Sequence, residues 1–199
     1  MRTGRSATCL LDTDNMDEKP YKLISSDKQF QGNHISVYEE VWRNSDGNLH
    51  TYDVVRSPNA VVIVALDEEN KVLLVNQHRA GAGIHLLECP AGGIDFGESA
   101  IECAKRELRE ETGFSSENFT EIGSFWTIPG FASEKMFIFM AMGLFCDPLK
   151  PDDDEDLELF RVSFDEAIER AKQGQLSDAK TIAALFLAEE HIRRNTSSS

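Results

Sequence analysis

The sequence has few cysteines and no long hydrophobic segment. Its four cysteines are Cys9, Cys89, Cys103 and Cys146. They are widely spaced and include no CxxC pair, so no disulfide framework is expected, and reduced thiols indicate a cytoplasmic protein. The longest nearly uninterrupted apolar run, residues 136–146, is too short to cross a bilayer as a helix. No signal-peptide core follows the arginines near the N-terminus, so nothing indicates export.

Positive charge is also scarce. Twenty lysines and arginines stand against 35 aspartates and glutamates, for a formal net charge of −15. A chain of this charge repels nucleic acid and anionic membranes, so we expect neither as a partner, and RNA decapping is disfavoured. Acidic surfaces also keep proteins in solution, so the charge argues against polyanion binding without identifying a function.

The length and patterning indicate one main domain with a small accessory element. We expect tails at residues 1–18 and 195–199, an N-terminal accessory β element at 19–57, and the main domain at 58–194. Residues 34–43 and 49–56 are rich in β-branched and aromatic types. The turn sequence Asn-Ser-Asp-Gly-Asn at 44–48 separates them, which predicts an antiparallel hairpin.

The main domain should mix strands with a few segregated helices, an α+β or α/β sandwich. Strands are predicted at residues 60–66, 71–76, 120–127, 135–145 and 157–162. Helices are predicted at 99–111, at 164–173 and from just after Ser177. A glycine-rich loop at 92–97 leads into the first helix, and Gly113 stands where a C-terminal cap belongs.

The first of these helices carries clustered carboxylates. Glu107 and Glu111 are four positions apart, so they share one helix face, and Glu110 lies beside them. Such close carboxylates repel one another, and hard cations with oxygen ligands would remove that repulsion. Ile101, Ala104 and Leu108 recur at spacings of three and four, so an apolar face can anchor the helix. A solvated acidic helix is the alternative interpretation.

The surrounding residues favour the metal site. The segment resembles the Nudix box, G-x₅-E-x₇-R-E-U-x-E-E-x-G-U, where U is apolar. Every specified position is filled, by Gly92, Glu98, Arg106, Glu107, Leu108, Glu110, Glu111, Gly113 and Phe114. A chance match of the seven invariant types has a probability on the order of 10⁻⁹ per starting position. The remaining alternative is a Nudix fold that has lost activity or serves as a binding module.

The resemblance implies an α+β fold, the Nudix αβα sandwich with a mixed sheet, and roles for the matching residues. Glu107 and Glu111 would be principal Mg²⁺ ligands, Glu110 would assist, and the carbonyl of Ala91 would add a ligand; Mn²⁺ could replace Mg²⁺. Arg106 would orient the carboxylates. Glu98 would support the box.

Further segments resemble the ADP-ribose pyrophosphatases of this superfamily. These are residues 88–95, 77–79, 128–134 around Pro129, and 154–181. The resemblance implies substrate contacts by Arg79, Glu88 and Glu134, and catalysis by Glu155, Glu111 and Arg106. Glu155 would be the general base, although neighbouring acids in 152–158 are alternatives.

The activity implied is Mg²⁺-dependent hydrolysis of the pyrophosphate bond of ADP-ribose or a related nucleoside diphosphate sugar, by a homodimer. A GDP-mannose-type or broad nucleotide-sugar hydrolase is the alternative, followed by a non-catalytic nucleotide-sugar sensor. Trp42, Tyr38 and Tyr52 could stack on a base, or could simply pack on a hairpin face.

Overall fold

The computed structural model describes residues 21–150 and 157–196. The chain divides into two compact units, the first ending at Val55 and the second beginning at Arg56. This boundary lies two residues before the predicted one, which falls between 57 and 58. None of the helices in the described part of the chain combines the length and hydrophobicity that a membrane crossing requires.

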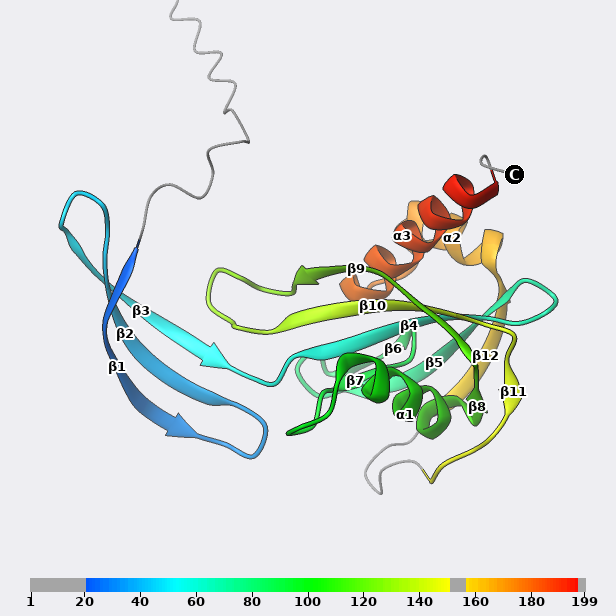
Figure 1. Ribbon diagram of the computed structural model, residues 1–199, viewed down its shortest axis with the longest axis horizontal. Coiled ribbons are helices and arrows are strands. Elements are labelled where there is room, and N and C mark those ends of the chain that lie inside the picture. Colours follow the sequence, from blue (N-terminus) through cyan, green and yellow to red (C-terminus); the bar gives the residue numbers. More distant parts are fainter. Residues whose placement is uncertain (1–20, 151–156, 197–199) are drawn as a thin grey trace, which may run out of the picture. The chain divides into compact units, whose positions relative to one another are not determined.

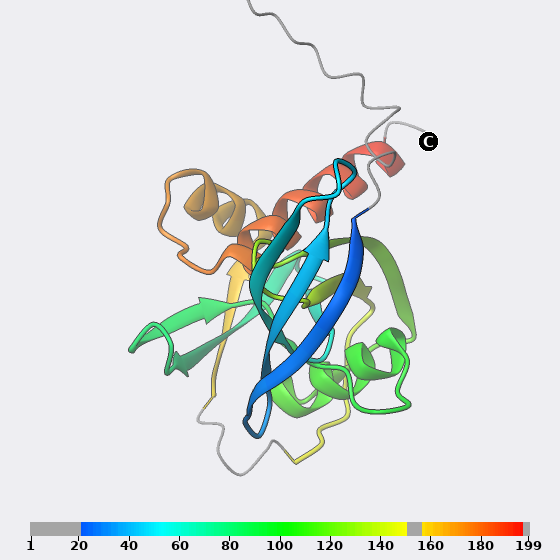
Figure 2. The same cartoon turned by 90° about the vertical axis from the view of Figure 1, so that its left-hand side faces the viewer.

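The first unit is a three-stranded sheet (Figure 2) with the order β1-β2-β3. Its strands are β1 (Lys22–Gln31), β2 (Ser36–Arg43) and β3 (Leu49–Arg56). The hairpin between β2 and β3 is confirmed, and its turn is closed by a 3.0 Å bond from the Asn44 N–H to the Asn48 carbonyl. Strand β1, antiparallel to β2, is an addition that the sequence analysis does not specify. Its polar Ser-Ser-Asp-Lys centre obscures the apolar alternation that marks a strand.

The second unit is built on a seven-stranded mixed sheet of order β12-β5-β4-β10-β9, with β6 paired to β5 and β7 to β4. The strands are β4 (Ala60–Leu66), β5 (Lys71–Arg79), β6 (Ile84–Glu88), β7 (Ala91–Gly93), β9 (Asn118–Trp126), β10 (Lys135–Met142) and β12 (Glu158–Ser163). The β4–β10 pair is parallel, whereas β9 runs antiparallel to β10 and β12 to β5. A separate short pair joins β8 (Phe114–Ser115) to β11 (Phe145–Cys146).

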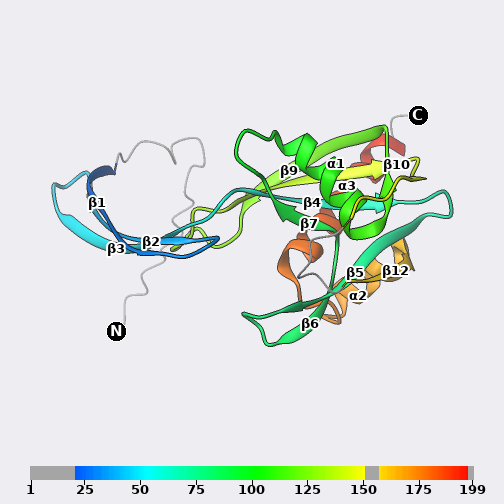
Figure 3. The same ribbon diagram turned by 90° about the horizontal axis from the view of Figure 1, so that it is seen from below.

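Helices cover both faces of this sheet, α1 (Ala100–Thr112) on one and α2 (Phe164–Lys172) with α3 (Ala179–Thr196) on the other (Figures 1 and 3). Strand β4 is buried along its whole length because its alternate side chains enter two cores. Val62 and Val64 pack on the side of α2 and α3, and Val61 and Ile63 pack on the side of α1. Each such side chain stabilises the fold by about 1.5–3 kcal/mol. The predicted αβα sandwich is confirmed.

Some predicted boundaries shift for identifiable reasons. The strand predicted at 135–145 ends at Met142, because Gly143 adopts a left-handed φ of 67° and turns the chain before β11. The tail predicted at 195–199 is helical at its start, since α3 continues to Thr196. The Thr196 hydroxyl donates to the Ile192 carbonyl at 3.1 Å. Strands β6 and β7 were not predicted, because β6 has only five residues and β7 has three, two of them glycines.

Candidate active site

Helix α1 is fixed at both ends by its own sequence. Ser99 caps the N-terminus in a capping box with Glu102, whose carboxylate accepts the Ser99 N–H at 2.9 Å. Gly113 closes the C-terminus at φ 76° and donates to the Arg109 carbonyl at 3.1 Å. The helix is anchored through Ala104 and Leu108, both fully buried. The apolar face was predicted to include Ile101, but Ile101 is exposed. Cys103 is the residue that joins Ala104 and Leu108 in the core.

Arg106 binds three carboxylates at once. Its Nε donates to Glu98 at 3.0 Å, and its Nη1 donates to Glu107 at 2.6 Å and to Glu110 at 2.9 Å. Its Nη2 reaches the Gly93 carbonyl at 3.0 Å. The bond to Glu98 is the main reason that the pKa of Arg106 is raised and the pKa of Glu98 is lowered. Arg106 therefore contacts the carboxylates that it is predicted to orient, and the role itself stays a prediction.

The two principal acids of the box lie against strand β7. Glu107 and Glu111 are only 7% and 6% exposed. The Ala91 N–H donates to the Glu111 carboxylate at 3.0 Å. A Cβ placed on Gly92 would lie 2.0 Å from Glu107 Oε1, so only glycine leaves room for that carboxylate. Strand β7 and helix α1 therefore fix the positions of Glu107 and Glu111 jointly. The glycine at the start of the box is needed because the two elements approach so closely at Gly92.

These residues suit a divalent metal by the chemistry of their donors. Glu107, Glu110 and Glu111 offer hard carboxylate oxygens on consecutive turns of one anchored helix, which Mg²⁺ and Mn²⁺ prefer. In this conformation Arg106 and the Ala91 N–H engage them, and residues 21–150 and 157–196 contain no group of three or more His, Cys, Asp or Glu side chains already arranged around one point. The Ala91 contact seen is through its N–H; the ligand role of its carbonyl stays a prediction.

A second ionic cluster brings together segments that are distant in sequence. Arg79, at the end of β5, donates from Nε and Nη2 to Glu88, at 3.0 and 2.7 Å. Lys180, at the start of α3, donates to the same carboxylate and lies 3.0 Å from Asp178. Glu88 is only 1% exposed, so its predicted contact with substrate stays a prediction, and its contacts here are with protein cations. Sequence reasoning did not assign a site role to Lys180 or Asp178.

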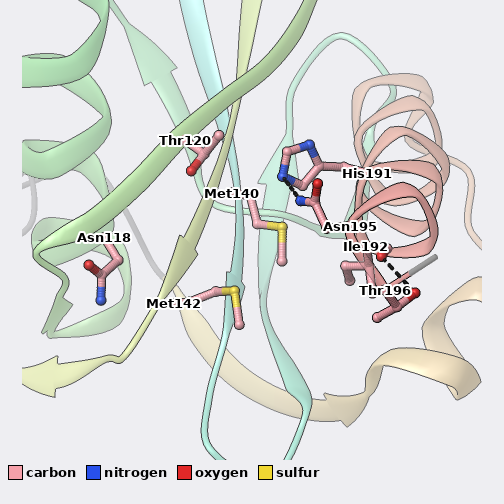
Figure 4. Close-up of a pocket in the computed structure, with 8 residues that line it drawn as sticks. All are labelled: Asn118, Thr120, Met140, Met142, His191, Ile192, Asn195 and Thr196. Atoms are coloured by element: carbon pink, nitrogen blue, oxygen red, sulfur yellow. Dashed lines mark hydrogen bonds between the residues drawn. The ribbon is translucent and has the colours of Figure 1, made fainter. Parts of the chain in front are cut away.

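The other predicted site residues lie in connections. Glu134 belongs to the β9–β10 connection; its side chain is half-buried and its carbonyl accepts the Thr127 N–H at 3.2 Å. Glu155 lies outside the described residues. A cavity of about 260 Å³ lies elsewhere (Figure 4), between α3 and strands β9 and β10. Its walls include Met140 and His191 and none of the predicted site residues.

Cys89 and Cys103 are not reactive groups of this site, and the third described cysteine, Cys146, is exposed on β11. Cys89 and Cys103 are buried, and burial raises the pKa of both, that of Cys89 to about 12. Cys103 instead packs beneath the box, where its thiol donates to the Gly93 carbonyl at 3.3 Å. Both residues therefore serve packing.

The fold is an αβα sandwich, and it holds clustered carboxylates on the capped helix α1 against strand β7. Together these features define the class of protein as a hydrolase of the Nudix fold. The NUDIX domain model matches residues 56–185, so the chain belongs to this family and is a Nudix pyrophosphohydrolase. Members of the family generally use divalent metal cations.

Relatives support the same assignment. An ADP-ribose pyrophosphatase of Bacillus subtilis (strain 168) is 32% identical over 166 residues, 82% of this chain and 90% of the relative. A methanol dehydrogenase activator of Bacillus methanolicus is 33% identical with the same coverage. A GDP-mannose pyrophosphatase of Cronobacter sakazakii is 27% identical and covers 75% of this chain and 83% of its own. A crystal structure of an ADP compounds hydrolase shares the fold, with a TM-score of 0.77 at 24% identity over 88% and 95% of the two chains.

Proposed function

We propose that this enzyme hydrolyses the pyrophosphate bond of a nucleoside diphosphate sugar with Mg²⁺, and that ADP-ribose is its substrate. The observation that carries the proposal is the set of carboxylates gathered by Arg106 on α1, which offers donors for metal beside an anionic substrate. The choice of ADP-ribose is supported by the 32% identity with the Bacillus subtilis ADP-ribose pyrophosphatase over most of both chains.

Glu107, Glu110 and Glu111, with the Ala91 carbonyl, would hold the magnesium. When bound, the metal would neutralise charge on the diphosphate and lower the pKa of a water molecule. Arg106 offsets the repulsion among these carboxylates by binding two of the three directly, Glu107 and Glu110. This organisation explains how a chain with a net charge of −15 could accept a doubly anionic linkage.

Arg79 would bind the diphosphate and Glu155 would act as general base. Arg79 is 37% exposed, so part of its guanidinium remains accessible while Glu88 fixes the rest. Glu155 would take the proton of the water that attacks one phosphorus, as the other phosphate leaves. For ADP-ribose the products are AMP and ribose 5-phosphate. Glu134 would contact substrate from the β9–β10 connection.

The substrate assignment is tested with a panel of purified nucleoside diphosphate sugars and Mg²⁺. We expect ADP-ribose to give the highest kcat/KM. Faster turnover of GDP-mannose would favour the second candidate, for which the Cronobacter sakazakii relative is the specific observation. Binding of the panel without turnover, with Mg²⁺ or Mn²⁺, would instead indicate a nucleotide-sugar sensor.

The general base is tested separately, by Glu155→Gln. We expect a fall in kcat of about 10²–10⁴-fold with KM nearly unchanged, because a positioned base contributes that much to a proton transfer. A parallel Glu117→Gln variant makes the same change of charge at an exposed residue outside 152–158 and should behave as the parent. An unchanged rate for Glu155→Gln would move the base role to another acid of residues 152–158.

We further propose a cytoplasmic homodimer. The described cysteines are free thiols, which supports a reducing compartment. Phe30 and Leu49 of the three-stranded sheet, and Tyr21 just before it, are more than half exposed, which supports a partner for that sheet. The indole N–H of Trp42 donates to Glu40 at 2.9 Å, a bond in the plane of the ring, and base stacking by Trp42 stays a prediction. Sedimentation equilibrium should return twice the chain mass; a single-chain mass would refute the dimer.

A further inference from the structure

We propose that Lys180 is a positioning residue of the substrate site: through the buried carboxylate of Glu88, it fixes the guanidinium of Arg79. This inference rests on the proposed function, since it assigns to Arg79 the binding of a diphosphate. It also changes the role of Glu88 from a substrate contact to the shared counter-ion of two cations.

The geometry of Arg79 leaves one edge of its guanidinium for a ligand. Its Nε and Nη2 both donate to Glu88, at 3.0 and 2.7 Å. No hydrogen bond from its Nη1 to any residue of 21–150 or 157–196 is present, and the side chain is 37% exposed. A guanidinium held in this way presents a fixed donor edge, which lowers the entropy lost when it binds a phosphate.

The buried position of Glu88 explains why a second cation is needed. Its side chain is 1% exposed, and a carboxylate removed from water in this way is stable only with several charge-assisted bonds. Arg79 supplies some of them, and Lys180, itself 15% exposed, supplies another. If Lys180 were neutral, Arg79 alone would have to compensate Glu88, and its guanidinium would be drawn further toward that carboxylate.

The start of α3 is hydrogen-bonded to the segment between β6 and β7, and this bond fixes the position of Lys180. Asp178 accepts the N–H of Thr181 at 2.9 Å and its hydroxyl proton at 2.6 Å, which caps the helix. The Thr181 hydroxyl oxygen in turn accepts the Cys89 N–H at 2.8 Å. Cys89 directly follows Glu88 and stands two residues before Ala91, whose N–H holds Glu111.

Arg79 also interacts electrostatically with Glu111, an acid of the box. The pKa of Arg79 is raised, first by its bond to Glu88 and then by the charges of Glu88, Glu111 and Asp178, which together outweigh the opposing effect of burial. Arg79 therefore lies within the field of a box carboxylate. A diphosphate contacted by Arg79 would lie close to the acids proposed to bind metal.

The test compares Lys180→Gln with Lys172→Gln. Lys172 forms an exposed pair with Glu189 at 3.3 Å, so its substitution makes the same change of charge away from Glu88. For ADP-ribose we expect Lys180→Gln to raise KM about 10-fold and to change kcat by less than about 3-fold, because a ground-state contact is loosened. Lys172→Gln should leave both constants within about 2-fold. Lys180→Arg, which keeps the charge, should restore KM to within about 3-fold of the parent.

Calorimetric titration of the intact chain with inorganic pyrophosphate and excess Mg²⁺ makes the test independent of turnover. Weaker binding by Lys180→Gln, with binding by Lys172→Gln unchanged, supports the inference even if no sugar nucleotide is hydrolysed, an outcome that would overturn only the proposed function. Equal affinity of Lys180→Gln and the parent overturns the inference while leaving the function standing. Absence of pyrophosphate binding by the parent overturns it as well. If Lys180→Gln does not unfold cooperatively, the test rests on Lys180→Arg, which retains the charge. A KM near the parental value supports the proposed role of Lys180. A KM raised 10-fold contradicts it.

Discussion

The two ionic clusters of the main domain differ in charge balance and in sequence separation. The Arg106 cluster sets one guanidinium against the carboxylates of Glu98, Glu107 and Glu110, a surplus of two negative charges. The cluster around Glu88 pairs two cations, Arg79 and Lys180, with two carboxylates. An acidic surplus suits the binding of cations, whereas a balanced cluster with partly exposed cations suits the positioning of an anion.

The largest effect on kcat is expected at Glu111, the carboxylate of α1 that accepts a hydrogen bond from strand β7. Glu111→Gln should lower kcat by about 10³-fold or more, because one proposed metal ligand loses its charge while the side chain keeps its shape. Saturation kinetics with ADP-ribose and Mg²⁺ measure this effect. The matched control is Glu117→Gln. Glu117 is an exposed residue beyond the end of α1, so this variant should behave as the parent. Parental turnover by the Glu111 variant would remove Glu111 from the metal site.

A backbone test of the same cluster uses two adjacent glycines. Gly92→Ala should lower kcat by about 10²-fold, since the new Cβ would lie 2.0 Å from Glu107 Oε1 and must displace that carboxylate. Gly93→Ala is the control, because nothing lies within 4 Å of a Cβ built there. Steady-state kinetics of both variants decide the matter. Equal losses in the two would show that strand β7, and not Glu107, is sensitive to substitution.

The balanced cluster should respond mainly in KM. Arg79→Lys keeps the charge but loses the planar set of donors that binds Glu88 on one edge and is open on the other. We expect KM for ADP-ribose to rise about 10-fold and kcat to fall by less than about 3-fold. Initial-rate measurements over a range of substrate concentrations separate the two constants. If kcat fell and KM did not, Arg79 would act in the chemical step, and the contrast between the clusters would fail.

The smallest effect concerns an ion pair outside both clusters. Burial raises the pKa of Asp67, but the Lys71 N–H, Arg161 and the Glu69 N–H together lower it overall. A pKa lowered by folding contributes stability above the unfolded value and loses it as the pH falls through the folded value. Asp67→Asn should therefore cost about 1 kcal/mol at neutral pH, after screening by solvent. Urea unfolding should show this difference shrinking below about pH 4; a difference independent of pH would contradict the charge argument.

The contrast between the clusters also shows what the sequence can predict. Arg106, Glu107 and Glu110 are neighbours on one helix, so their meeting follows from helical geometry alone. The C-terminal cap of α1 at Gly113 and the strand at 60–66 are equally local features, and both are confirmed. The αβα arrangement was accessible because strand and helix patterns, together with the box, restrict the fold.

What sequence reasoning missed depends on long-range contacts. Lys180 and Glu88 are 92 positions apart, and no local rule brings them together. The segment Ser-Asp-Ala-Lys-Thr at 177–181 does start with helix-capping residues, which places a lysine at a helix start but does not say what it faces. The collision at Gly92 is likewise invisible without coordinates, although the invariant glycine of the box indicates that a close approach is needed.

The most direct test of the account is hydrolysis of ADP-ribose followed by ³¹P NMR, first in a metal chelator and then after Mg²⁺ is added back. We predict that the diphosphate resonances persist in the chelator and are replaced by two phosphomonoester resonances, AMP and ribose 5-phosphate, once Mg²⁺ is present. Conversion at the same rate in the chelator would contradict a metal site built on the carboxylates of α1.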